Sequence, residues 1–158
     1  MRASGILMPV FSLPSRYGIG SLSKSAYQFV DMLKKAGQKY WQILPLCPTS
    51  YGDSPYQSFS TYAGNPYFID LDQLIEEKLL TRKECQACDF GDDPQDIDYG
   101  KLYENRFKLL RKAYERANVG EDQEFEAYRR ENAWWLDDYA LFMAVKDRFD
   151  GVAWNEWA

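Results

Sequence analysis

The sequence predicts an α/β fold that opens with a strand, a helix and a second strand, and three segments support that prediction. Residues 5–11, GILMPVF, form a continuous apolar run, which is typical of a short strand covered on both faces. A helical pattern occupies residues 23–36, and residues 39–44, KYWQIL, indicate the second strand. Strand, helix and strand in so short a stretch form a βαβ unit, whose two strands are expected to be parallel.

The helix over residues 23–36 is predicted from the spacing of its apolar side chains and from its ends. Ser21 or Ser23 can serve as the N-cap, and Gly37 follows the last turn. Pro45 and Pro48 then stop the second strand, because a proline has no backbone N–H to donate to a strand ladder. The apolar residues at helical spacing are Ala26, Phe29, Val30 and Leu33.

The remainder of the chain, residues 73–158, is expected to be a mostly helical subdomain, set apart from a βαβ part over residues 1–72. The apolar residues Leu71, Leu74, Ile75 and Leu79 predict a short helix, and an acidic loop over 89–100 follows it. Residues 100–117 predict an amphipathic helix with Tyr103, Phe107, Leu110 and Tyr114 on its apolar face and its charged side chains in solvent. A last helix, from Ala133 to Arg148, is expected to pack through Leu136, Tyr139, Ala140 and Met143. The five tryptophans are expected to pack in the core or the subdomain: Trp41, Trp134, Trp135, Trp154 and Trp157.

Composition excludes several function classes. The net charge of -5 and the absence of a basic block argue against nucleic-acid binding, which depends on neutralising phosphates. The first apolar run breaks at Pro9, too early for a membrane span or a cleaved leader, so a cytoplasmic protein is expected. Cys47, Cys85 and Cys88 are expected to be free thiols, because the chain has no histidine and no second cysteine pair to complete a metal site.

The segment YGDSPYQSFSTYAGNPY, residues 51–67, combines tyrosine and phenylalanine with residues that favour turns. It follows the second strand, and ligand sites of α/β folds lie beyond the C-terminal ends of parallel strands. A tyrosine ring packs against the apolar face of a sugar while its hydroxyl forms hydrogen bonds, and Asp, Asn, Gln and Ser can orient a polyol. Composition alone fits an interface or a core equally well.

The order of the residues is more informative than their composition. The segments RASGILMPVFSLPSRYGIGSL, AGQKYWQILPL, PTSYGDSPYQSFSTYAGNPYFIDL and WWLDDYALFMAVK resemble, in sequence and in order, the N-terminal part of 4-α-glucanotransferases, also called amylomaltases. The family's motif GYGDSPYQS has Ser50 in place of its first glycine here. The resemblance implies a (β/α)8 barrel that transfers α-1,4-glucan segments between maltooligosaccharides with retention of configuration and without a cofactor.

The same resemblance implies that no catalytic residue lies in this chain. In the family, a carboxylate nucleophile and an acid/base carboxyl lie on later barrel strands, about 5 Å apart as a retaining mechanism requires. A complete barrel takes about 250 residues. The chain is therefore expected to be an N-terminal portion with an incomplete barrel, inactive alone, and able to self-associate through the unfinished surfaces.

The resemblance also assigns substrate-binding residues. Tyr56 would stack against the glucosyl unit next to the scissile bond, with Ser54 and Gln57 lining the same donor-side groove. Tyr51 would contact the glucan at a further position. Asp53 is expected to support the loop or to hydrogen-bond a sugar rather than to act as a nucleophile, since no second acid accompanies it. Plain packing remains the alternative for both tyrosines.

Two other functions are compatible with these residues. One is a non-catalytic glucan-binding module that reuses this sequence without chemistry. The other is an α-glucan hydrolase, which differs only in whether water or a sugar hydroxyl resolves the covalent intermediate.

Overall fold

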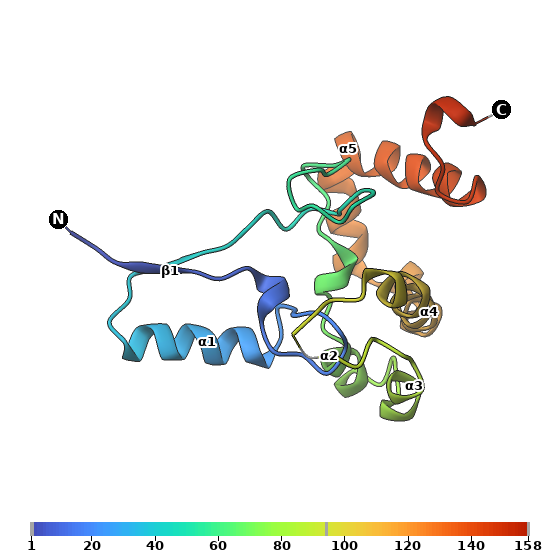
Figure 1. The fold of residues 1–158 in the computed structure, drawn as a ribbon. Helices are drawn as coiled ribbons and strands as arrows, with labels where there is room; N and C mark the ends of the chain where they lie inside the picture. The colour runs from blue at the N-terminus through green and yellow to red at the C-terminus, as the bar shows by residue number, and fades with distance from the viewer. Residues whose placement is uncertain (1, 94, 158) are drawn as a thin grey trace.

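The structure is a computed structural model that describes residues 2–93 and 95–157, so residue 94 of the predicted acidic loop lies outside the described part. The strands and α1 lie at the left of Figure 1, α2, α3 and α4 lie at the lower right, and α5 with the C-terminus lies at the upper right. The elements are β1 (Gly5–Leu7), α1 (Lys24–Lys35), β2 (Tyr40–Gln42), α2 (Leu71–Glu76), α3 (Arg82–Gln86), α4 (Tyr99–Ala117) and α5 (Gln123–Arg148). Single 3-10 turns occupy Val10–Ser12, Pro66–Phe68, Val119–Glu121 and Trp154–Glu156.

The predicted βαβ unit is confirmed. β1 and β2 pair in parallel with Gly5 opposite Tyr40, and α1 connects them. Gly5 is needed for this close pairing, because a Cβ at that position would lie 2.6 Å from the Tyr40 carbonyl oxygen. The amide of Met8 donates to the carbonyl of Gln42 at 3.0 Å and continues the ladder past β1.

The strands are shorter and more exposed than predicted. β1 ends at Leu7 instead of continuing to residue 11, because Pro9 has no N–H to donate and the chain turns there into a 3-10 turn. Ile6 and Leu7 are 39% and 55% exposed, so the expectation of a strand covered on both faces is wrong. Within residues 2–93 and 95–157 the sheet has only these two strands, so the outer edge of each strand has no neighbouring strand.

Two clusters of buried side chains form the core. The smaller one joins the start of the chain to α1 through Val10, Leu13 and Ala26, and Trp41 packs against it as the sequence predicted. Its indole N–H donates to the Met8 carbonyl at 2.8 Å. The larger cluster packs the loop before α1 against α2, α3 and α4; it comprises Tyr17, Ile19, Tyr67, Leu71, Leu80, Cys85, Phe90, Leu102, Leu109 and Ala113. It draws on residues from both sides of the boundary predicted at residue 72.

The buried face of α4 differs from the prediction. Leu102, Arg106, Leu109 and Ala113 are buried, whereas Tyr103 and Tyr114 of the predicted apolar face are exposed. These four residues lie on one helical face, but the sequence pattern does not mark that face as apolar because Arg106 lies in its middle. The expectation that the charged residues of this helix all lie in solvent is therefore wrong for Arg106.

Arg106 is a buried cation that ties three segments together. Its guanidinium donates to the carbonyl oxygen of Ile69 before α2 at 2.5 Å and to that of Tyr17 before α1 at 3.5 Å. Burial is the main reason that the pKa of Arg106 is lowered to about 10, and the negative charge of Asp70 counteracts this. The side chain therefore holds α4 against two loops through backbone oxygens.

The remaining helices differ from the predictions at their ends. α2 ends at Glu76 and not at Leu79, because Lys78 adopts a left-handed conformation that turns the chain. α3 was not predicted, although Thr81 and Glu84 form a capping box at its start. α5 begins ten residues earlier than expected, after Asp122, whose carboxylate accepts from the amides of Glu124 and Phe125.

Glu84 links α3 to α4, and this link predicts an acid-sensitive contribution to stability. Arg116 of α4 donates to both carboxylate oxygens of Glu84 at 2.9 and 2.7 Å. These bonds, followed by those to Thr81, hold the pKa of Glu84 well below its ordinary value of 4.5. A carboxyl whose pKa is lower in the folded state stabilises the fold above about pH 4.5, and that contribution is lost as the pH falls further.

We therefore expect Glu84→Gln to lower the free energy of unfolding near neutral pH and to flatten its decline below about pH 4.5. Urea unfolding between about pH 6 and pH 3 measures this. Glu104→Gln, which replaces an exposed glutamate of α4, is the matched control. An equal acid-induced decline in the Glu84→Gln variant and the wild type would show that the Arg116 contact contributes nothing.

Candidate functional site

The candidate site is the loop over residues 50–67, which lies beyond the C-terminal ends of β1 and β2, as predicted. The chain leaves β2, crosses to the other end of the molecule and forms the loop beside α5 (Figure 1). At the base, the amide of Asn65 donates to the Leu46 carbonyl at 2.8 Å. At the tip, the amide of Ser50 donates to the Gln57 carbonyl at 3.1 Å. The loop is thus closed twice by backbone hydrogen bonds.

The tip has a tightly turned backbone. Gly52 and Asp53 both have positive φ, 90° and 55°, and the amide of Asp53 donates to the Ser50 carbonyl at 3.0 Å. The amide of Gln57 donates to the Ser54 carbonyl at 3.0 Å, which forms a second turn. Glycine suits the first of these positions because a left-handed residue without a Cβ has no steric penalty.

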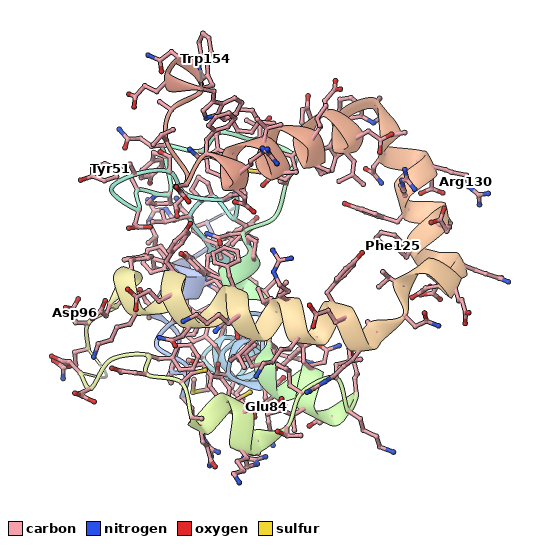
Figure 2. The ribbon with its side chains drawn as sticks, turned by 90° about the vertical axis from the view of Figure 1, so that its right-hand side faces the viewer. Tyr51, Glu84, Asp96, Phe125, Arg130 and Trp154 are labelled. Atoms are coloured by element: carbon pink, nitrogen blue, oxygen red, sulfur yellow. The ribbon has the colours of Figure 1, made fainter. Side chains whose placement is uncertain are left out.

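These turns place the two predicted sugar-stacking rings in solvent. Tyr51 is fully exposed and Tyr56 is 73% exposed. Tyr51 stands at the outer edge of the loop and points away from the helices (Figure 2). Neither ring is packed into the core, so each ring is accessible to a ligand.

The polar residues of the tip have distinct environments. The Ser54 hydroxyl accepts from the Tyr56 amide at 3.3 Å, and the Gln57 side chain is exposed. The Asp53 carboxylate accepts from the Thr49 hydroxyl at 3.3 Å. Burial, and after it the negative charge of Asp53, raises the pKa of Tyr67 to about 12. Burial and the same charge also raise the pKa of Tyr99. The charge of Asp53 therefore acts on two phenol groups outside the tip.

The inner side of the loop packs against a row of aromatic side chains on α5. The Phe59 ring stacks on Tyr139, with ring centroids 6.4 Å apart and an angle of 14°, and lies 6.5 Å from Phe142. The Tyr62 ring meets Trp134 at 4.7 Å and Trp135 at 5.8 Å. The sequence predicted packing for Tyr139 and Trp135 but did not indicate Phe142. Trp134 and Trp154, which were also predicted to pack, are 66% and 71% exposed. Spacing was the available signal, since residues 135, 139 and 142 lie on one helical face.

The residues predicted to bind substrate are thus brought together at one tip. All five lie within residues 50–57, the segment that the backbone hydrogen bond between Ser50 and Gln57 closes: Tyr51, Asp53, Ser54, Tyr56 and Gln57. Asn65, at the base of the loop, accepts from the Tyr67 amide at 2.9 Å and caps the 3-10 turn at Pro66–Phe68.

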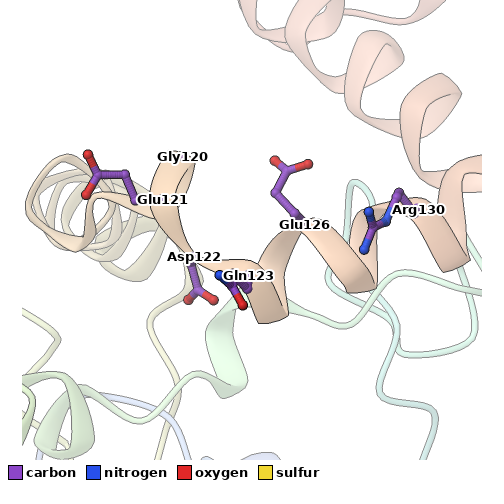
Figure 3. A pocket seen from close by; sticks show the side chains of 6 residues that line it. All are labelled: Gly120, Glu121, Asp122, Gln123, Glu126 and Arg130. Atoms are coloured by element: carbon purple, nitrogen blue, oxygen red, sulfur yellow. The ribbon is translucent and has the colours of Figure 1, made fainter.

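A hollow elsewhere in the molecule is a poor ligand site. It has a volume of about 360 Å³ and lies at the start of α5, lined by Gly120, Glu121, Asp122, Gln123, Glu126 and Arg130. Glu121 and Glu126 point to one side of the backbone while Asp122 and Gln123 point to the other (Figure 3). These groups do not converge, and the Asp122 carboxylate already caps the helix.

Two further findings concern the described residues only. No group of three His, Cys, Asp or Glu side chains comes together there in a way that could hold a metal ion. The helices of residues 2–93 and 95–157 include none with the length and apolar character needed to cross a membrane.

Comparison with known proteins identifies close relatives. The 4-alpha-glucanotransferase family matches residues 8–158. A 4-alpha-glucanotransferase from Clostridium butyricum is 54% identical over 150 residues, which cover 95% of this chain and 31% of the relative. One from Thermus thermophilus is 48% identical over 160 residues, again 31% of its length. The structure of an amylomaltase from Streptococcus agalactiae in complex with acarbose superposes with a TM-score of 0.91 at 44% identity, covering 99% of this chain and 32% of that one. The chain thus spans about a third of each relative.

Proposed function

Because the chain belongs to the 4-alpha-glucanotransferase family, we propose that the whole protein transfers α-1,4-glucan segments between maltooligosaccharides by a retaining double displacement. The observation that carries the proposal is the loop tip, where the family-like motif SYGDSPYQS presents the exposed rings of Tyr51 and Tyr56. An exposed, rigidly turned tyrosine suits the apolar face of a glucosyl unit, because little conformational freedom is lost on stacking.

In the proposed whole protein, β1 and β2 are the first strands of a (β/α)8 barrel, and residues 73–158 are an inserted helical subdomain that leads back to it. The parallel pairing of β1 with β2 supports this arrangement. So do the exposed side chains of Ile6, Leu7 and Tyr40, which further strands and helices of a barrel would cover. Without that cover, the same apolar surface favours self-association of the 158-residue chain.

Each residue of the tip has a proposed role. Tyr56 stacks on the glucosyl unit beside the scissile bond, and Ser54 and Gln57 line the same groove. Tyr51 contacts the glucan further along. Asp53 shapes the tip; its left-handed backbone and the hydrogen bond that it accepts from Thr49 support this role. Its carboxylate can also accept a hydrogen bond from a sugar hydroxyl.

The nucleophile and the acid/base carboxyl are proposed to come from parts of the protein outside these residues. The two carboxyl groups of a retaining enzyme lie about 5 Å apart and need no metal or organic cofactor. A cytoplasmic location is proposed with them, since Cys47, Cys85 and Cys88 are free thiols in the structure.

Maltotriose disproportionation tests this function. The 158-residue chain and a version extended to the natural end of the reading frame are incubated with maltotriose, and glucose and longer maltooligosaccharides are quantified. We expect both products from the extended protein and no turnover from the shorter chain.

Other product patterns would contradict the proposal in different ways. Glucose without longer oligosaccharides would identify a hydrolase. Glucan binding without turnover by the extended protein would identify a non-catalytic module. Turnover by the purified 158-residue chain would show that a catalytic pair lies within it.

A further inference from the structure

We propose that Tyr139 and Phe142 of α5 are positioning residues that hold the loop over residues 50–67 in its glucan-binding arrangement through Phe59. The proposal rests on the proposed function, because the loop's role in glucan binding does. It adds a second element to the site, since Tyr139 and Phe142 lie about eighty residues after Phe59 along the sequence.

The loop has two sides with opposite environments. On the outer side, the rings of Tyr51 and Tyr56 are exposed. On the inner side, Phe59 lies over both Tyr139 and Phe142, and Tyr62 lies against Trp135. Phe59 is only three residues after Tyr56, so a displacement of its ring shifts the backbone that carries the Tyr56 ring.

The tip itself has few other supports. Its turns are held by short-range backbone bonds between Ser50, Asp53, Ser54 and Gln57. A Cβ built on Gly52 meets nothing within 4 Å, which indicates open surroundings at the tip. The local bonds fix the shape of the tip, whereas the Phe59 contacts fix where the tip lies relative to α5.

Other aromatic side chains support the aromatic row on α5. The Trp157 ring packs against Phe142 at 5.4 Å and stacks on Phe149 at 5.9 Å, and its indole N–H donates to the Val152 carbonyl at 3.1 Å. Trp135 also contacts Tyr139 at 6.0 Å. Because its members are supported on both sides, the row is suited to position a loop, and not only to exclude water from the space beneath it.

The expected effect on transfer follows from geometry. A misplacement of a binding group by about 1 Å can lower the rate of an enzyme about 100-fold. Tyr139→Ala removes the stacked partner of Phe59 and leaves the tip sequence intact. In the protein extended to the end of its reading frame, we expect the KM for maltotriose to rise about 10-fold, with kcat also reduced.

Three comparisons separate positioning from general destabilisation. Tyr139→Phe keeps the ring and should restore the wild-type KM, because the stack and not the hydroxyl matters. Tyr114→Ala removes an exposed ring of α4 and should leave KM unchanged. In a Tyr56→Ala background, Tyr139→Ala should cause little further loss, since the two residues act through one ring. If Tyr139 only stabilised the fold, Tyr139→Ala would lower the fraction of active enzyme and therefore kcat, and KM would not change. The losses caused by Tyr139→Ala and by Tyr56→Ala would then be independent of each other.

Chymotrypsin provides a readout that does not depend on glucan. It cleaves after exposed tyrosines, so we expect nicking after Tyr51 and Tyr56 to be about 10-fold faster in Tyr139→Ala than in Tyr139→Phe. Equal nicking rates, or an unchanged KM, would overturn the proposal. If the wild type transfers no glucan, the proposed function fails and the glucan-positioning role fails with it, whereas faster nicking would still establish Tyr139 as the anchor of the loop.

Discussion

Replacing Tyr56 by alanine is expected to lower kcat/KM for maltooligosaccharide transfer by about 50-fold. The ring is exposed in the unbound protein, so a glucosyl unit that stacks on it buries apolar area that alanine cannot offer. An area of about 100 Å² at about 25 cal/mol per Å² corresponds to about 2.5 kcal/mol, or roughly 50- to 100-fold. The loss should affect kcat as well as KM, because the stack lies beside the proposed scissile bond.

Two companions make this experiment specific. Tyr56→Phe keeps the ring face and should retain most of the activity, whereas Tyr27→Ala, at an exposed ring of α1, should retain all of it. Initial rates of glucose release from maltotriose measure the effect. A wild-type rate for Tyr56→Ala would remove this side chain from the glucan site.

The second large effect is expected at Arg106, where alanine should lower the free energy of unfolding by about 3–5 kcal/mol. The substitution opens a cavity beside Leu102 and Leu109 on the buried face of α4. It also leaves the carbonyl oxygens of Tyr17 and Ile69 without their donor. An orphaned buried acceptor costs about 1–3 kcal/mol, and the lost side-chain volume adds to this.

Urea unfolding of three variants separates the contributions. Arg106→Met keeps most of the volume and also removes the cost of burying a charge, so we expect about half the loss of Arg106→Ala. Arg111→Ala, at an exposed arginine of the same helix, should change stability by less than about 0.5 kcal/mol. Equal stability of Arg106→Ala and Arg111→Ala would show that the buried guanidinium does not connect the three segments.

The sequence was sufficient for features that depend on local pattern. Parallel pairing of β1 and β2 followed from two apolar runs separated by a helical one, and Trp41 packed as expected. The position of the loop followed from the topology of the βαβ unit. The roles of Tyr51, Ser54, Tyr56 and Gln57 depend on resemblance to a family, because tyrosine in a loop is equally common in interfaces.

Features that depend on contacts between residues far apart in the sequence could not be predicted from the local pattern of apolar residues. The buried face of α4 was not predicted because it contains Arg106. An arginine is expected to lie in solvent unless its backbone hydrogen-bond partners are known. The spacing of Trp135, Tyr139 and Phe142 was visible, but the loop that they contact is far away in sequence. β1 is shorter than the apolar run because Pro9 has no N–H to donate, and the chain continues from there as a 3-10 turn with Val10 buried.

The measurement that tests the central claim most directly is the crystal structure of the protein, extended to the end of its reading frame, with acarbose bound. We expect a ring of acarbose to lie face to face with Tyr56, with ring carbons in van der Waals contact at about 4 Å. Ser54 or Gln57 should lie within hydrogen-bonding distance of its hydroxyl groups. Acarbose bound away from residues 50–67, with the Tyr56 ring as exposed as in the unbound protein, would contradict the assignment of this loop as a wall of the glucan site.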